Sequence, residues 1–155
     1  MSAALIDGKA ISATINARTA AEVAALKEKH GLTPGLAVVL IGEDPASKVY
    51  VNMKVKKSAE LGIHSEKIVL PADATMARVL DLVEELNANA QIHGILVQSP
   101  PPPQIDEDQV VDRINPAKDV DCFHAVNVGK MLIGKTDGFF PCTPHGVMAM
   151  LRESG

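Results

Sequence analysis

The sequence predicts an α/β fold, a three-layer αβα sandwich with a mostly parallel sheet. Short apolar runs rich in β-branched residues alternate along the chain with segments of helical periodicity, which is the pattern of βαβ units. The apolar runs are continuous, which indicates strands that are covered on both faces. With 155 residues, of which 46% are hydrophobic and 22% charged, the chain has the size and composition of one globular domain.

The first helix and the first strand are expected in direct succession. Apolar residues recur at near-helical spacing among alanines over residues 6–30, and His30-Gly31 provides a C-terminal stop. A turn at Thr33-Pro34-Gly35 then leads into LAVVLIG, residues 36–42. This run is short, apolar and β-branched, so it predicts a buried strand.

The stretch KVYVNMKVKK, residues 48–57, allows two interpretations. Its apolar residues alternate with polar ones, as in a half-buried strand. However, Asp44 can cap a helix, and Pro45 suits the first helical position. We therefore favour a helix, on which Tyr50 and Lys54, four residues apart, share a face.

The following elements complete the sheet. A strand over residues 66–70 is closed by Pro71, and a helix is predicted over residues 75–90 from an apolar face opposite acidic residues. A third strand is expected over residues 92–97. The prolines 100–103 cannot continue a central strand, so the chain leaves the sheet at its carboxyl edge, where ligands of open α/β sheets bind.

The last third of the chain carries weaker patterns. Residues 106–114 predict a short helix, whereas residues 116–135 are expected to be irregular. Thr143 is a suitable N-cap for a final helix, with Pro144 at its first position. The residues expected to face inward on this helix are Val147, Met150 and Leu151.

Composition excludes several classes of function. A net charge of −4 provides no electrostatic footprint for nucleic acid, so no nucleic-acid partner is expected. No apolar run approaches membrane-spanning length, and no basic segment followed by an apolar run begins the chain, so no membrane association and a cytoplasmic protein are expected. Cys122 and Cys142 are expected to be free thiols rather than a disulfide.

The residues themselves also exclude common chemistries. The five histidines form no ligand-spaced pair with cysteine or acid, so no metal is expected. No glycine-rich phosphate loop follows a predicted strand, and no serine or cysteine lies in a nucleophile elbow. The polar residues that remain at the ends of regular structure are Tyr50, Lys54, Gln98, Asp119 and Asp121. Taken alone, their spacing is more typical of a solvated surface than of a functional site.

Four segments, read together, resemble a known family. They are ASKVYVNMKVKKSAELGI from Ala46, GILVQSPPPP from Gly94, PAKDVDCFHAVNVGKM from Pro116 and PCTPHG from Pro141. In this order they resemble the signatures of the bifunctional methylenetetrahydrofolate dehydrogenase/methenyltetrahydrofolate cyclohydrolase enzymes. The resemblance spans essentially the whole chain and implies one-carbon folate metabolism with tetrahydrofolate derivatives as substrates.

The resemblance also implies roles for single residues. It places the catalytic residues at Lys54 and Gln98, the substrate-stacking tyrosine at Tyr50 and the substrate-binding aspartate at Asp121. Further substrate contacts are implied at Val97, Ser99 and Pro100. These assignments agree with the chemistry of the side chains, because Tyr50 offers a flat aromatic face and Asp121 can accept hydrogen bonds from pterin N–H groups. Gln98 can hold Lys54 and orient water.

Within the motifs, the chain departs from the family at three positions. Ser99 and Pro101 stand where the family usually has leucine, which makes the cleft less apolar and its loop stiffer. Cys122 replaces the glycine of DVDGF. If that glycine has a positive φ, Cys122 strains the loop that holds Asp121.

Family members continue into a Rossmann domain that binds NADP, and this domain is expected to be missing here. The expected division is a folate-binding catalytic domain over residues 1–140 and, over residues 141–155, the start of the helix that would lead into the NADP-binding domain. The complete protein is expected to be a homodimer and the 155-residue chain a monomer. A domain cut from a longer protein and a natural short form both remain open.

Three functions follow from the resemblance. The first is oxidation of 5,10-methylenetetrahydrofolate with NADP, by the complete protein only, together with hydrolysis of 5,10-methenyltetrahydrofolate to 10-formyltetrahydrofolate. The second is a non-catalytic folate-binding or subunit-interaction module, and the third is a cyclohydrolase alone. Without a dinucleotide site, the chain itself is expected to lack dehydrogenase activity.

Overall fold

The computed structural model describes residues 5–155 of the chain. Its elements alternate between helix and strand as far as the third strand, and three helices follow. In chain order they are α1 (Gly8–His30), β1 (Gly35–Ile41), α2 (Pro45–Glu60), β2 (His64–Leu70), α3 (Met76–Ala88), β3 (Gly94–Val97), α4 (Glu107–Arg113), α5 (Ala125–Leu132) and α6 (Cys142–Ser154).

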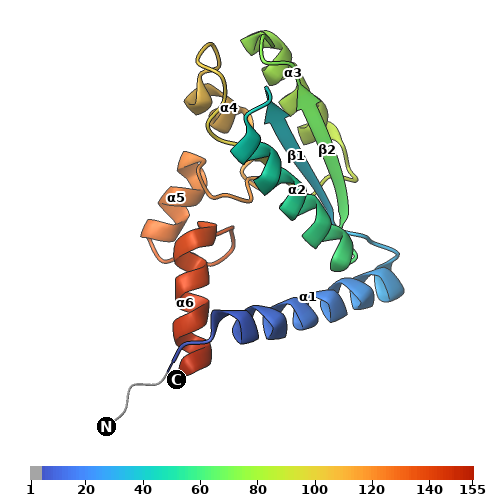
Figure 1. Cartoon of the computed structure of the whole chain (residues 1–155), viewed down its shortest axis with the longest axis vertical. Coiled ribbons are helices and arrows are strands. Elements are labelled where there is room, and N and C mark those ends of the chain that lie inside the picture. Colours follow the sequence, from blue (N-terminus) through green and yellow to red (C-terminus); the bar gives the residue numbers. More distant parts are fainter. Residues whose placement is uncertain (1–4) are drawn as a thin grey trace.

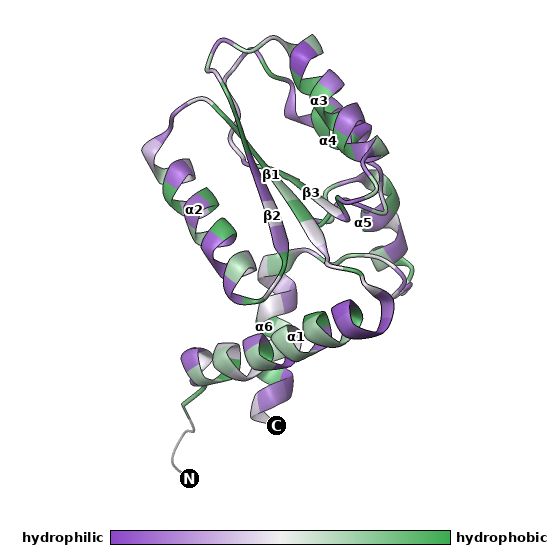
Figure 2. Ribbon diagram, turned by 90° about the vertical axis from the view of Figure 1, so that its right-hand side faces the viewer, coloured by the Kyte–Doolittle hydropathy of each residue, from purple (hydrophilic) through white to green (hydrophobic). Residues whose placement is uncertain are grey.

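The sheet is parallel, with β1 at its centre in the order β2-β1-β3. In register, Val39 lies opposite Ile68 on one side and Val97 on the other. Helix α2 covers one face of the sheet and α3 with α4 covers the other (Figures 1 and 2). The predicted three-layer αβα sandwich with a parallel sheet is therefore confirmed.

The burial of both faces of β1 explains why its sequence is continuously apolar. Ala37, Val39 and Ile41 belong to a core cluster with residues of α3 and α4. Val38 and Leu40 belong to a second cluster, which includes Val51 of α2. Both faces of β1 are therefore buried, so neither face can carry polar side chains.

The helical interpretation of residues 48–57 is confirmed. Asp44 caps α2, because its carboxylate accepts a hydrogen bond from the Ser47 backbone N–H at 2.7 Å. Pro45 occupies the first helical position, as its fixed φ and missing N–H favour. Val51 is fully buried against the sheet, whereas Tyr50 lies on the exposed side.

The expectation that residues 116–135 are irregular is wrong for α5. This helix of eight residues is too short to show a clear period, and its cap is unusual. The Nδ1 atom of His124 accepts a hydrogen bond from the Val126 N–H at 3.1 Å. The side chain of Asn127 is buried within the helix, which breaks the usual apolar pattern.

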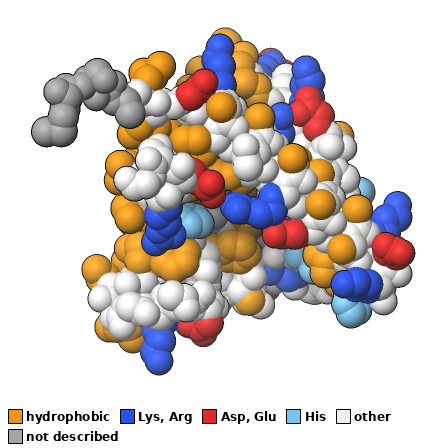
Figure 3. Space-filling model, turned by 90° about the horizontal axis from the view of Figure 1, so that it is seen from below, with side chains coloured by type: hydrophobic (Ala, Val, Ile, Leu, Met, Phe, Trp, Pro, Cys, Tyr) orange, Lys and Arg blue, Asp and Glu red, His pale blue; other side chains and the backbone are white. Residues whose placement is uncertain are grey.

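The expectations for the last helix are also corrected. Helix α6 begins at Cys142 after Pro141, and no side chain caps it, so Thr143 is not the N-cap. None of its residues is buried, and Val147 and Leu151 are about half exposed. The reason is its position, because α6 extends below the sandwich beside α1 instead of packing on the sheet (Figure 1). Hydrophobic side chains gather on this lower face of the molecule (Figure 3).

Among the helices of residues 5–155, none combines the length and hydrophobicity that crossing a bilayer requires.

Candidate functional site

The candidate site lies where the chain reverses its direction of winding across the sheet. From β1 the chain passes through α2 to β2 on one side, and it returns through α3 to β3 on the other side. Open α/β sheets bind ligands in the crevice at such a switch point, outside the carboxyl ends of the strands. Here that position lies between α2, which follows β1, and the loop that follows β3.

Lys54 and Gln98 meet across this crevice. The Lys54 Nζ atom donates a hydrogen bond to Gln98 Oε1 at 3.0 Å. The Gln98 Nε2 atom donates to the Ser99 carbonyl oxygen at 2.7 Å, which fixes the orientation of the amide. Both side chains are half-buried. The amide oxygen of Gln98 thus holds the lysine amine at the carboxyl edge of the sheet.

The other predicted contacts surround this pair. Tyr50 lies one turn before Lys54 on α2, and its side chain is 56% exposed, so the flat face of its ring is open to a ligand. Val97 ends β3 and is partly buried. Ser99 and Pro100 are exposed and are joined by a cis peptide bond.

Asp121 is brought to the site by a segment that runs beside β3. The backbone N–H of Ile95 donates to the Lys118 carbonyl oxygen at 2.7 Å, and Ile95 forms a parallel bridge with Asp119. Gly94 permits this close approach, because an added Cβ would lie 2.5 Å from Val120 Cγ1. Asp121 therefore stands next to the end of β3, near Gln98.

Burial and two neighbouring charges shift the pKa of the half-buried Asp121 carboxyl. Burial raises the pKa of Asp121 above its ordinary value of 3.8, the positive charge of Lys54 lowers it, and the negative charge of Asp119 raises it further. The structure thus brings Lys54, Gln98 and Asp121 together, with Tyr50 one helical turn away.

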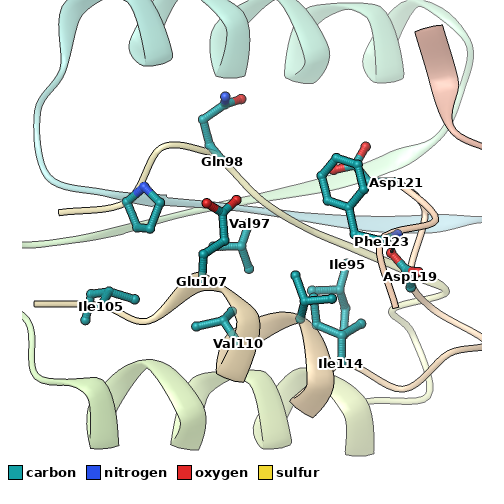
Figure 4. Close-up of a pocket in the computed structure, with 12 residues that line it drawn as sticks. Ile95, Val97, Gln98, Ile105, Glu107, Val110, Ile114, Asp119, Asp121 and Phe123 are labelled. Atoms are coloured by element: carbon teal, nitrogen blue, oxygen red, sulfur yellow. Dashed lines mark hydrogen bonds between the residues drawn. The ribbon is translucent and has the colours of Figure 1, made fainter. Parts of the chain in front are cut away.

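A cavity of about 20 Å³ lies beneath Gln98 and Asp121, which is room for about one water molecule. Val97 and Pro101 also line it (Figure 4). Two further lining residues, Glu107 and Phe123, were missed by sequence reasoning. Glu107 points from α4 toward the end of β3 in Figure 4. In the sequence it is indistinguishable from any acidic residue in the first turn of a helix.

Both cysteines are free, as predicted. Cys122 is buried and has a φ of 58°, so the condition under which this residue would strain the loop is met. Cys142 was not expected near the site, but its Sγ donates to the Val120 carbonyl oxygen at 3.7 Å. The pKa of Cys142 is raised by burial and by the charge of Asp121 and is lowered by Lys54, which places this thiol beside the site.

Across residues 5–155, no group of three or more histidine, cysteine, aspartate or glutamate side chains is arranged to hold a metal ion.

A parallel α/β sheet with polar side chains converging at its switch point is characteristic of small-molecule-binding α/β domains, and residues 5–155 have this construction. A family model described as the catalytic domain of tetrahydrofolate dehydrogenase/cyclohydrolase matches residues 6–121. The chain therefore belongs to the tetrahydrofolate dehydrogenase/cyclohydrolase family. The matched range includes Tyr50, Lys54, Gln98 and Asp121.

Individual relatives extend the similarity to nearly the whole chain. The Bifunctional protein FolD 2 of Geobacter metallireducens is 58% identical over 151 residues, which cover 97% of this chain and 52% of that protein. The crystal structure of the bifunctional enzyme FolD from Campylobacter jejuni is 43% identical with a TM-score of 0.95, over 97% of this chain and 53% of that one.

A second solved structure is the Trypanosoma brucei methylenetetrahydrofolate dehydrogenase-cyclohydrolase complexed with NADP cofactor and inhibitor. It is 37% identical with a TM-score of 0.92, over 99% of this chain and 52% of that one. The chain thus spans about half the length of the relatives that it matches.

Proposed function

We propose that this chain is the folate-binding catalytic part of a bifunctional methylenetetrahydrofolate dehydrogenase/methenyltetrahydrofolate cyclohydrolase. The observation that carries the proposal is the hydrogen bond from Lys54 Nζ to Gln98 Oε1 at the carboxyl edge of the sheet. It joins the two residues that would hydrolyse the methenyl substrate, and Asp121 lies close enough for its pKa to respond to the charge of Lys54.

Binding is assigned to residues on the two sides of the crevice. Tyr50 would stack on a flat ring of the folate, because one face of its ring is open to solvent. Asp121 would accept hydrogen bonds from pterin N–H groups, for which its ionised form offers two acceptor oxygens. Val97, Ser99 and Pro100 would line the crevice along the chain that leaves β3.

Hydrolysis is assigned to Lys54 with Gln98. The oxygen of water bonds to the methenyl carbon, the bond from that carbon to N5 breaks, and one proton is released, which yields 10-formyltetrahydrofolate. The amine of Lys54 would take a proton from the attacking water and move it as the ring opens. Gln98 would hold the lysine amine and the water in line.

The dehydrogenase step is assigned to the complete protein, for which we propose NADP as cofactor and a homodimer as the assembly. Residues 5–155 do not suit a dinucleotide, because Gly42 at the end of β1 is followed by Glu43 and Asp44, which would repel a pyrophosphate. In that step the present residues would only bind and orient the folate. Residues 1–140 are proposed as the folate domain, with residues 141–155 leading toward the cofactor domain.

The test is the loss of methenyltetrahydrofolate absorbance in the presence of the purified chain. We expect acceleration by wild type, none by Lys54→Met, and wild-type acceleration by Lys56→Met. Lys56 is a matched control, because it is an exposed lysine two residues further along the same helix. Equal rates for wild type and Lys54→Met would contradict the proposed hydrolysis.

One observation favours a second candidate, a folate-binding module without turnover. Cys122 has a left-handed backbone directly after Asp121, at a position where a side chain is disfavoured. Binding of folate by the wild-type chain without any acceleration would support this alternative. Acceleration by wild type would exclude it.

A further inference from the structure

A buried carboxylate beside the site has no part in the proposed reaction. Asp119 is only 3% exposed. Its Oδ1 atom accepts a hydrogen bond from the Phe123 N–H at 3.3 Å, and its Oδ2 atom accepts from the His124 N–H at 3.0 Å and from Asn127 Nδ2 at 2.9 Å. A buried carboxylate is tolerated only when such donors replace water, and these three bonds supply the partners that its oxygens need.

Two of these three donors, the N–H groups of Phe123 and His124, belong to the turn that carries Asp121. Residues 119–124 fold around the Asp119 carboxylate, and the Cys122 N–H closes the turn on the Asp119 carbonyl oxygen at 3.4 Å. The left-handed Cys122 lies inside this turn and does not by itself favour its conformation. The conformation of the turn therefore depends on the carboxylate at its start.

The same residue ties the turn to two elements, to β3 through its backbone and to α5 through its carboxylate. The Asp119 backbone is bridged to Ile95 of β3. The Asn127 side chain belongs to α5 and also donates to the Pro116 carbonyl oxygen at 2.8 Å. Asp119 thus joins the edge of the sheet to the start of α5, and Asp121 lies between these two attachments along the chain.

We propose that Asp119 is a positioning residue, whose carboxylate holds the 119–124 turn so that Asp121 faces Lys54 across the ligand crevice. The identity of the ligand as a folate rests on the function proposed above, but the positioning does not. The charged and titratable groups around Asp121 are Lys54 from α2, Asp119 from its own segment, Cys142 at the start of α6 and Glu107 of α4, which lines the same cavity.

Positioning and electrostatics predict opposite effects for Asp119→Asn. The charge of Asp119 raises the pKa of Asp121, so its removal favours the ionised Asp121 that would bind the ligand. A purely electrostatic role thus predicts equal or tighter binding. A positioning role predicts weaker binding, because an asparagine offers one acceptor oxygen and turns an NH₂ group toward an N–H donor.

The experiment compares wild type, Asp119→Asn, Asn127→Ala and the control Asp112→Asn, which removes an exposed acid on α4. Affinity is measured by calorimetry with 5-formyltetrahydrofolate, a stable folate. We expect a loss of about 10-fold or more for Asp119→Asn, since hydrogen bonds to a charged group are removed. Asn127→Ala should lie between this variant and wild type, and the control should match wild type.

Two measurements on the ligand-free chain test the positioning role of Asp119 independently of the proposed function. Hydrogen exchange should accelerate at the Phe123 amide and at the His124 amide in Asp119→Asn, because the substitution alters the two oxygens that accept from them. If wild type binds no folate, the proposed function fails, whereas these readouts still decide the positioning. Wild-type exchange at both amides, or wild-type affinity in Asp119→Asn, would overturn it. If Asp119→Asn does not fold, Asn127→Ala carries the same test, because it retains the charge and both backbone donors.

Discussion

The hydrogen bond between Lys54 and Gln98 leads to a prediction about two substitutions made singly and together. Lys54→Met removes the amine, and Gln98→Ala removes the oxygen that accepts from Lys54 Nζ at 3.0 Å. If Gln98 acts mainly through Lys54, Gln98→Ala should matter only while the lysine is present. Most of its effect should therefore disappear in the Lys54→Met background.

The structure sets the size of these effects. General acid–base catalysis contributes about 10²–10⁴-fold, so Lys54→Met should lower the rate of hydrolysis by this amount. A hydrogen bond to a charged group contributes about 1.5–3 kcal/mol. Because both side chains are only half-buried, solvent screens the bond, and we expect the lower part of this range. Gln98→Ala should then cost about 10- to 50-fold in rate.

The assay is the initial rate of methenyltetrahydrofolate hydrolysis at saturating substrate for wild type, both single variants and the double variant. Gln91→Ala serves as the control, because this exposed glutamine lies near the opposite edge of the sheet. The double variant should be within about 3-fold of Lys54→Met, which corresponds to a coupling of about 0.7 kcal/mol or more. Losses that multiply would show that the two residues act independently and would refute the reasoning.

Three further predictions concern the turn and the edge of the sheet. Cys122→Gly should be more stable than Cys122→Ala by about 1 kcal/mol in urea unfolding. Both variants lose the thiol, but only glycine adopts a φ of 58° without strain. Equal stabilities would refute backbone strain at this position. Gly94→Ala should lower the free energy of unfolding by about 1–3 kcal/mol, because its Cβ would meet Val120 at 2.5 Å; an unchanged unfolding midpoint would contradict the close approach. The pKa of Asp121 should lie above 3.8 in ¹³C NMR titration and rise further in Lys54→Met, which removes the charge that lowers it. Because the folded state binds this proton more tightly, the contribution of Asp121 to stability is greatest at low pH and falls as the pH rises from about 3.8 through the folded pKa; a lower pKa in Lys54→Met would contradict the assigned cause.

The sandwich could be predicted from the sequence because each layer leaves a local pattern. The apolar run of β1 indicates burial on both faces, and Asp44 with Pro45 indicates the start of α2 despite the alternation that follows. These signals depend on neighbours in the chain. They are therefore readable without knowledge of the fold.

The candidate site was predictable only in part. Tyr50 and Lys54 share a helix face, which their spacing reveals. The contact of Lys54 with Gln98, 44 positions away, requires the packing of α2 over β3 and has no local signal. The resemblance of the four motifs to a known family identified these residues as a site. The chemistry of the side chains alone did not decide between a site and a solvated surface.

Other features could not be predicted because their cause lies outside their own segment. Helix α6 carries apolar residues at helical spacing, but it lies below the sandwich and its residues remain unburied. The polar residue Asn127 is buried because it bonds to Asp119 from another segment. In both cases the surroundings, not the periodicity, determine burial.

The central claim is that the carboxyl edge of the sheet binds a tetrahydrofolate. The most direct test is a titration of the ¹⁵N-labelled chain with 5-formyltetrahydrofolate, followed by NMR. The account predicts shift changes centred on Tyr50, Lys54, Gln98 and Asp121. A hollow of about 610 Å³ at the amino edge, lined by His30, His64 and His93, provides an internal comparison. Shift changes centred on these histidines, with none at the four site residues, would contradict the account.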